Sequence, residues 1–359
     1  WDVLFAGKGW QQDCDRELFI FAELLTALCA SSDDALTAVR RADSVFVFAP
    51  AGPFRDAALL FVRLLDDRAR SQRMEVEAHA TSPSGSATLT FGATLPRWAP
   101  PSPDGVVAVP RVHAPCLEVL RRLIAEDRPF VVHGGELEAW PAHERWASLA
   151  YLDRVVGHRL VPIEVGGTVG GAGWREELML LSDFLRTQLA PSCEHCAKEE
   201  GREESRAGFG AVAYLAQHEL LDQCPVLRAD VDVPASWREV LGWPARVNAW
   251  LGTHGTVTPC HWDSYANFLT QVQGRKRALL LAPEAKSRLY VDEASGGIAA
   301  QGNISPVDVE APDLSKFPAF EGSRVELAEI GPGDALFMPR GWWHQVRALT
   351  PSFSVNFWF

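Results

Sequence analysis

Apolar residues recur at helical spacing through the first part of the chain. They cover most of the surface of a predicted helix at residues 15–28. Two further segments with this spacing follow at 31–41 and 55–65, and a break rich in proline and glycine separates them at 49–53. The pattern predicts a small helical N-terminal module over residues 1–72.

The next stretch, residues 73–116, loses this periodicity. Proline, serine and glycine are dense at 82–86 and again at 98–105. Such composition is typical of linkers and loose loops rather than of a packed core. We therefore predict a linker over residues 73–116, with the domain boundary inside it.

From residue 117 the pattern becomes that of a mainly β domain with helical decoration. Short apolar runs predict strands, and amphipathic spacing predicts helices between them. Early helices followed mostly by strands favour a jelly-roll barrel, which we expect to span residues 117–359. The predicted helices lie at 117–124, 146–156 and 176–185, and the first predicted strands at 129–133 and 160–165.

One segment of this domain breaks the pattern. Residues 191–206 contain Cys193-Glu-His-Cys196 followed by a charged run. A lone Cys-x-x-Cys could form half of a zinc site, but no second pair at matching spacing follows it. We predict an inserted loop at 191–206.

Composition narrows the class of protein. The chain has 359 residues, of which 47% are hydrophobic and 22% charged, and a formal net charge of −12. This charge argues against a protein that coats nucleic acid and is compatible with attraction of basic peptides. Seven irregularly spaced cysteines suit reduced thiols. With no predicted membrane helix or signal peptide, we expect an intracellular protein of the nucleus or cytoplasm that contacts neither nucleic acid nor membrane directly.

Two histidines and an aspartate carry the strongest chemical signal. His261 and Asp263 are two residues apart, so on one strand both side chains would point to the same face. His344, on an irregular segment next to a later strand, could supply a second imidazole. Two imidazoles and one carboxylate are the ligands of non-haem Fe(II) oxygenases, because they leave adjacent positions open. His261, Asp263 and His344 are therefore the candidate metal ligands.

A lysine follows the first two candidate ligands in the chain. Residues 273–276 read as a hairpin-like turn, which places Lys276 at the start of a strand beside the metal strand. A cation there could pair with the distal carboxylate of a dicarboxylate co-substrate that chelates iron through its other end. The alternative is an ordinary solvated turn lysine.

The later motifs resemble those of one family. The chain is similar to JmjC-domain 2-oxoglutarate oxygenases of the cupin superfamily, and within them to the lysine demethylase eight group, also called the JmjC arginyl hydroxylase group. The resemblance implies a double-stranded β-helix for residues 117–359. It rests on the residues at 161–166, 214–220, 248–250, 256–259, 271–276, 307–318, 346–349 and 352–358.

The resemblance also implies roles for single residues. It implies Fe(II) on His261, Asp263 and His344, with O2 as oxidant. Thr258 stands where the family commonly has serine, and both residue types supply a hydroxyl. Glu164 and Trp250 fall where the family recognises a substrate arginine, and a carboxylate and an aromatic face both suit a guanidinium. The residues implied to bind 2-oxoglutarate are Lys276, Tyr214, Thr258, Asn267 and Trp358.

Three functions follow as alternatives. The first is a protein hydroxylase that oxidises arginine in a basic protein or peptide, such as a histone or a ribosomal or chromatin-associated protein, and yields succinate and CO2. The second is an N-methyl-lysine demethylase of histones that uses the same iron centre. The third is a non-catalytic jelly-roll interaction module, since fold alone does not imply function.

Overall fold

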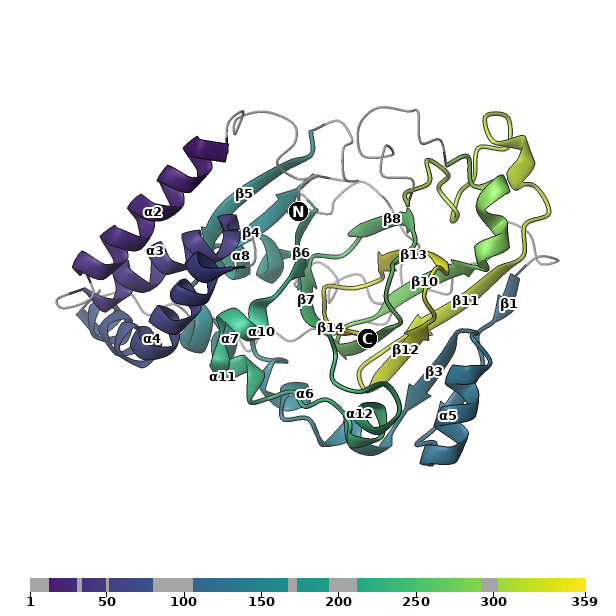
Figure 1. Ribbon diagram of the computed structural model, residues 1–359, viewed down its shortest axis with the longest axis horizontal. Coiled ribbons are helices and arrows are strands. Elements are labelled where there is room, and N and C mark those ends of the chain that lie inside the picture. The colour runs from purple at the N-terminus through teal and green to yellow at the C-terminus, as the bar shows by residue number, and fades with distance from the viewer. Residues whose placement is uncertain are drawn as a thin grey trace.

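The N-terminal region forms three packed helices, as predicted. The computed structural model describes residues 13–30, 34–49, 52–79, 106–166, 173–193, 212–291 and 303–359. Helices α2 (Asp13–Ala30), α3 (Ala35–Phe48) and α4 (Pro53–His79) share a small apolar core around Val45, Phe46 and Val62. Asp34 caps α3 by accepting a hydrogen bond from the backbone N–H of Thr37. Figure 1 shows these helices beside the end of the β-rich domain that carries β4 and β5.

The β-rich domain that follows contains two sheets, and they confirm the predicted jelly-roll type of fold. The smaller sheet has the strand order β1-β11-β10-β13-β8, and the larger has the order β2-β3-β12-β9-β14-β7-β6-β4-β5. One apolar cluster draws residues from both sheets, among them Leu269, Leu336, Ala278 and Val346, so the core lies between them. The strands are β1 Val106–Ala108, β2 Arg111–His113, β3 Phe130–His133, β4 Leu160–Val165, β5 Arg175–Leu180, β6 Ala213–His218, β7 Arg246–Gly252, β8 Val257–His261, β9 Asn267–Gln273, β10 Lys276–Leu281, β11 Val325–Ile330, β12 Asp334–Met338, β13 Trp343–Ala348 and β14 Ser352–Trp358.

Helices cover the outer face of the larger sheet. Trp146 stacks on Phe353 at 4.4 Å between ring centroids, and Trp237 stacks on Phe268 at 3.9 Å. These contacts bury the outward side chains of strands whose inward side chains face the other sheet. The further helices and helical turns are α5 Leu117–Ala125, η1 Gly135–Ala139, α6 Ala142–Arg145, α7 Leu149–Val156, α8 Leu181–Phe184, η2 Leu185–Leu189, α10 Leu220–Gln223, α11 Pro225–Arg228, α12 Ala235–Leu241, η3 Pro283–Arg288 and η5 Pro318–Phe320. In the part of the chain that is described, no helix combines the length and apolar character that crossing a bilayer requires.

Some element limits differ from the prediction. Residues 176–180 were expected to be helical, but they belong to β5, which pairs along its whole length with β4, so that prediction is wrong. Pairing to an existing strand outweighs the weak helical preference of this segment. Helix α4 runs beyond residue 72, and β1 and β2 lie within the predicted linker, where they pair with β11 and β3. The division into domains otherwise stays a prediction.

Two further predictions meet the structure only in part. Residues 273–276 do not close a hairpin, because β9 and β10 lie in different sheets and do not pair. The turn is a corner at which the chain crosses between sheets. It requires Gly274, since φ is +72° there and a Cβ would lie 2.0 Å from the carbonyl oxygen of Pro351. Of the predicted inserted loop, Cys193 is buried in a short helical segment, and residues 194–206 lie outside the described residues.

A buried ionic cluster joins the N-terminal helices to the larger sheet. Arg159, which precedes β4, is fully buried and donates through Nε and a terminal nitrogen to both oxygens of Asp43 at 2.9 and 2.5 Å. Its other terminal nitrogen lies 3.2 Å from Asp66, and Asp43 also accepts from the backbone N–H of Leu160 at 3.0 Å. Burial alone would lower the pKa of Arg159, but the carboxylates raise it overall, so the guanidinium stays charged. The cluster fixes the start of β4 to α3 and α4.

We expect Asp43→Ala to lower the free energy of unfolding by about 3–5 kcal/mol, because it leaves the buried guanidinium without its main partner. Chemical denaturation measures this change. Glu239→Ala is the control, since it breaks an ion pair with Arg121 in which both side chains are more than half exposed. Equal effects of the two substitutions would show that the buried cluster does not anchor the helices.

Candidate metal and co-substrate site

The candidate metal ligands converge at one end of the space between the two sheets. His261 is the last residue of β8, and it pairs with His344 on the neighbouring strand β13. One ligand atom from each of His261, Asp263 and His344 lies within 4.8 Å of the others. Asp263 lies two residues past the end of β8 rather than on the strand, and His344 lies within β13 rather than on an irregular segment, so both details of the prediction are wrong. The backbone of Asp263 is still held in place, because its carbonyl accepts a hydrogen bond from the Gly341 N–H at 3.0 Å.

Backbone carbonyls orient both imidazole rings. Nδ1 of His261 donates to the carbonyl of Pro259 at 2.8 Å, and Nδ1 of His344 donates to that of Trp342 at 2.9 Å. With the proton on Nδ1, each Nε2 presents a lone pair toward Asp263, whose oxygens lie 3.8 Å and 3.7 Å away. Carbonyl bonds of this kind are how proteins fix the tautomer of a metal-binding histidine.

The electrostatics of the three residues suit a divalent metal ion. Burial, and secondarily His261, lower the pKa of His344 to about 4, so this imidazole is neutral at pH 7. Metal binding requires neutral imidazoles, and Asp263 adds one negative charge. Two imidazole nitrogens and one carboxylate fit Fe(II) with further coordination positions left open.

A pocket beside these ligands contains Lys276. Its side chain is 1% exposed, and Nζ donates to the Tyr214 hydroxyl at 3.1 Å. Burial lowers the pKa of Lys276 to about 7, and among the described residues no carboxylate forms an ion pair with it. A buried ammonium without a counterion is costly, which favours an anionic ligand in this pocket.

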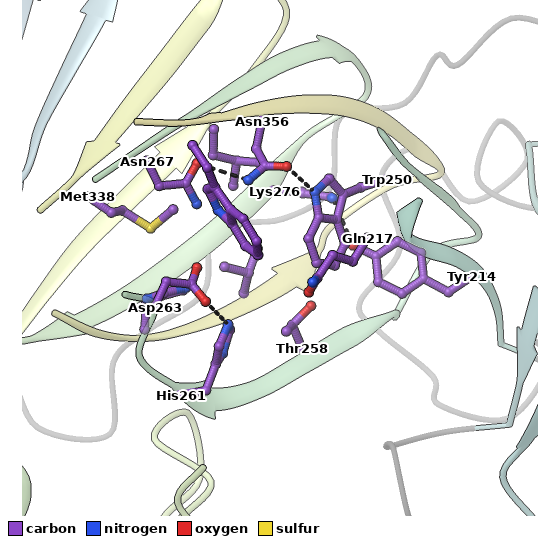
Figure 2. Close-up of a pocket in the computed structure, with 14 residues that line it drawn as sticks. Tyr214, Gln217, Trp250, Thr258, His261, Asp263, Asn267, Lys276, Met338 and Asn356 are labelled. Carbon is purple, nitrogen blue, oxygen red and sulfur yellow. Dashed lines mark hydrogen bonds and ion pairs between the residues drawn. The ribbon is translucent and has the colours of Figure 1, made fainter. Parts of the chain in front are cut away.

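The pocket brings together nearly all of the predicted binding residues (Figure 2). Trp250 donates from Nε1 to Asn356 at 3.0 Å, and Asn356 donates to Asn267 at 3.1 Å. Trp358 stacks on Tyr265 at 5.2 Å, and its buried Nε1 has no hydrogen-bond partner among the described residues. The predicted residues that line the pocket are His261, Asp263, His344, Lys276, Tyr214, Thr258, Asn267, Trp250 and Trp358.

Sequence reasoning missed five other residues that line this pocket, of which Leu269 and Val346 are apolar residues of the core between the sheets. Asn356 lies in an alternating polar and apolar run, which could have indicated a polar inward face. Gln217 has φ +46° at an irregularity in the pairing of β6 with β7, a conformation that no sequence pattern predicted. Met338 offers no chemical signal in sequence.

Glu164 is the predicted residue that lies next to the pocket instead of lining it. It pairs with Tyr214 across β4 and β6, and with Glu176 across β4 and β5. Burial, with Glu176 nearby, raises the pKa of Glu164 to about 7, and burial also raises the pKa of Glu176 to about 7. The indole N–H of Trp174 lies 3.5 Å from Glu164. Two carboxylates and an aromatic ring thus stand beside the pocket.

Comparison with known proteins agrees with this geometry. A family described as "Cupin-like domain" matches residues 116–359. The chain is 36% identical over 264 residues to "Lysine-specific demethylase 8" of Xenopus tropicalis, which covers 71% of this chain and 54% of that protein. It is 39% identical over 255 residues to the Danio rerio protein of that name, with 70% and 58% covered, and 35% identical over 254 residues to "Jumonji C domain-containing protein 5" of Drosophila melanogaster, with 70% and 59% covered.

The chain therefore spans little more than half the length of these curated relatives. The match nevertheless includes every strand from β3 to β14 and all three candidate metal ligands. The chain belongs to the family of cupin-like JmjC domains.

Proposed function

We propose that this chain is an Fe(II)- and 2-oxoglutarate-dependent protein hydroxylase that acts on arginine in a basic protein or peptide. The observation that carries the proposal is the convergence of His261, Asp263 and His344 beside the buried ammonium of Lys276. The ligands suit Fe(II), and the lysine suits the distal carboxylate of 2-oxoglutarate. Bound Fe(II) would supply oxygen activation coupled to decarboxylation of 2-oxoglutarate to succinate and CO2.

The protein side chains bind and orient. Lys276, held by Tyr214, would bind the distal carboxylate of 2-oxoglutarate, and Thr258 and Asn267 add a hydroxyl and an amide on the pocket wall. The carbonyls of Pro259 and Trp342 keep the two imidazoles in the tautomer that binds metal. Such fixed positions lower the entropic cost of bringing the reacting groups together.

Glu164 supports an arginine substrate over a methylated lysine. A guanidinium has five N–H donors that can satisfy the carboxylates of Glu164 and Glu176, whereas methylation of an ammonium removes donors. Trp250 offers an aromatic face in the adjoining pocket. The net charge of −12 favours encounter with a basic partner such as a histone or a ribosomal protein.

The second candidate is an N-methyl-lysine demethylase. The names of the similar proteins from Xenopus tropicalis and Danio rerio favour it, and the candidate iron site serves both reactions. In this reaction hydroxylation of a methyl group is followed by release of formaldehyde.

We expect the chain, given Fe(II) and 2-oxoglutarate, to add one oxygen atom to an arginyl peptide and to form succinate in equal amount. Mass spectrometry of the peptide and of succinate measures both products. His261→Ala should lose at least about a hundredfold in rate, because the metal loses a ligand. Formaldehyde from methyl-lysyl peptides without arginine oxidation would support the demethylase instead. No product from either peptide, with partner binding intact in His261→Ala, would support a non-catalytic module.

Replacing Glu164 by Gln should raise KM for the arginyl peptide about tenfold or more, because it removes a charged acceptor worth about 1.5–3 kcal/mol. The affinity for 2-oxoglutarate should not change. Glu177→Gln is the matched control, because Glu177 follows Glu176 on β5 and points to the opposite face. A similar KM in all three proteins would mean that Glu164 does not contact the substrate.

The affinity for 2-oxoglutarate should depend on pH through Lys276. The ammonium is the binding form, and its pKa of about 7 in the free protein means that it is present below pH 7 and is lost as the pH rises. The dissociation constant should therefore be level below pH 7 and rise up to about tenfold per pH unit above it. Calorimetry with Mn(II) in place of Fe(II) measures this dependence. Lys276→Met should bind more weakly and show no such rise; a rise that persists in this variant would assign the dependence to another group.

A further inference from the structure

Two histidines meet beside the start of β12, the strand whose other end carries Met338 of the pocket. His113 ends β2 and His133 ends β3, and the parallel register of these strands places the two residues side by side. Their Nδ1 atoms are 3.3 Å apart, and their ring centroids are 4.9 Å apart. His113 is exposed and His133 is half-buried, so solvent reaches both rings.

The backbone keeps this arrangement open. Gly134 follows His133 with φ +83°, and a Cβ there would lie 2.7 Å from Nδ1 of His113. Only glycine therefore leaves room for the His113 ring. The N–H of Ala114 donates to the carbonyl of His133 at 2.8 Å, which ties the ends of the two strands together. The backbone thus fixes where the two residues lie, and Gly134 leaves space for the ring of His113.

The pair is separate from the candidate iron site. On β12, which pairs with β3, Asp334 lies opposite His133, whereas Met338 at the other end lines the pocket. Four residues of strand correspond to about 13 Å. The Asp334 carboxylate accepts a hydrogen bond from the Arg111 guanidinium at 2.5 Å, so these two charged groups are already paired with each other. A carboxylate oxygen of Glu138 lies 3.6 Å from the point at which Gly134 would carry a Cβ, and so borders the same space.

The distance between the two Nδ1 atoms matches the distance between two nitrogen ligands of one metal ion. Zinc with Zn–N bonds of about 2.0–2.1 Å in a tetrahedron holds its two nitrogens about 3.3 Å apart. A direct hydrogen bond would require opposite tautomers of the rings and would be longer than the usual 2.7–3.2 Å range for N–H donors. Neutral rings that both carry the proton on Nε2 would instead present two Nδ1 lone pairs to one ion.

We propose that His113 and His133 form a second metal site, which binds a divalent transition ion such as Zn²⁺ through both Nδ1 atoms. Imidazole ligands favour Zn²⁺, Cu²⁺ or Ni²⁺ over Mg²⁺ or Ca²⁺, and water completes the coordination. An ion there would add a side-chain link between β2 and β3, which already pair through their backbones in the larger sheet.

The test must separate this site from the candidate iron ligands. His261→Ala/His344→Ala therefore serves as the background protein, stripped of metal with a chelator. Equilibrium dialysis against Zn²⁺ followed by metal analysis gives the number of ions bound, and calorimetry gives the affinity. The same measurements follow after addition of His133→Ala, and after addition of His254→Ala as the control for loss of one histidine elsewhere.

We expect the background protein and the His254→Ala control to bind one Zn²⁺ more than the protein with His133→Ala, or to bind that ion at least about tenfold more tightly. Zinc should also raise the melting temperature of the background protein, and His133→Ala should abolish that rise while circular dichroism remains unchanged. Equal zinc binding with and without His133 would overturn the proposal. So would a background protein that binds no Zn²⁺.

Discussion

The structure depends on strands that are buried on both faces. In β7, β9 and β14 every second side chain packs under the helices, as Phe268 and Phe357 do, and the alternate side chains point between the sheets. The outward set is apolar except for Thr270 on β9. The inward set is largely polar, and it includes Asn267, Asn356 and Trp358 of the pocket. The apolar face thus supplies the stabilisation that lets the other face hold polar groups away from water, where they must bind each other or a ligand.

This arrangement explains how much of the molecule was predictable. The jelly-roll type of fold follows from local spacing, and nine of the residues that line the pocket follow from spacing or from the family resemblance. The structure places these residues together, although their roles stay predictions. Strands β1 and β2 have three residues each, too few for a two-residue period to show. The strand at β5 and the backbone of Gln217 depend on pairing with partners distant in sequence, which no local pattern encodes.

The buried ion cluster bears on the site as well as on the helices. Arg159 precedes β4, and Glu164 lies on the same strand beside Tyr214. A strand fixed at its start by Asp43 and Asp66 has little freedom to shift its register. The N-terminal helices thus contribute to the placement of a carboxylate next to the pocket, although none of their described residues lines it.

The buried ammonium of Lys276 has a consequence for the stability of the ligand-free chain. An ammonium buried without a carboxylate makes the ligand-free protein less stable than its packing alone would. An anion that binds only the folded state removes this cost and adds stability that grows with the logarithm of its concentration. If that anion is 2-oxoglutarate, a cell poor in this acid would hold more of the chain in opened forms exposed to proteases. Abundance, and not turnover alone, would then follow the supply of the co-substrate.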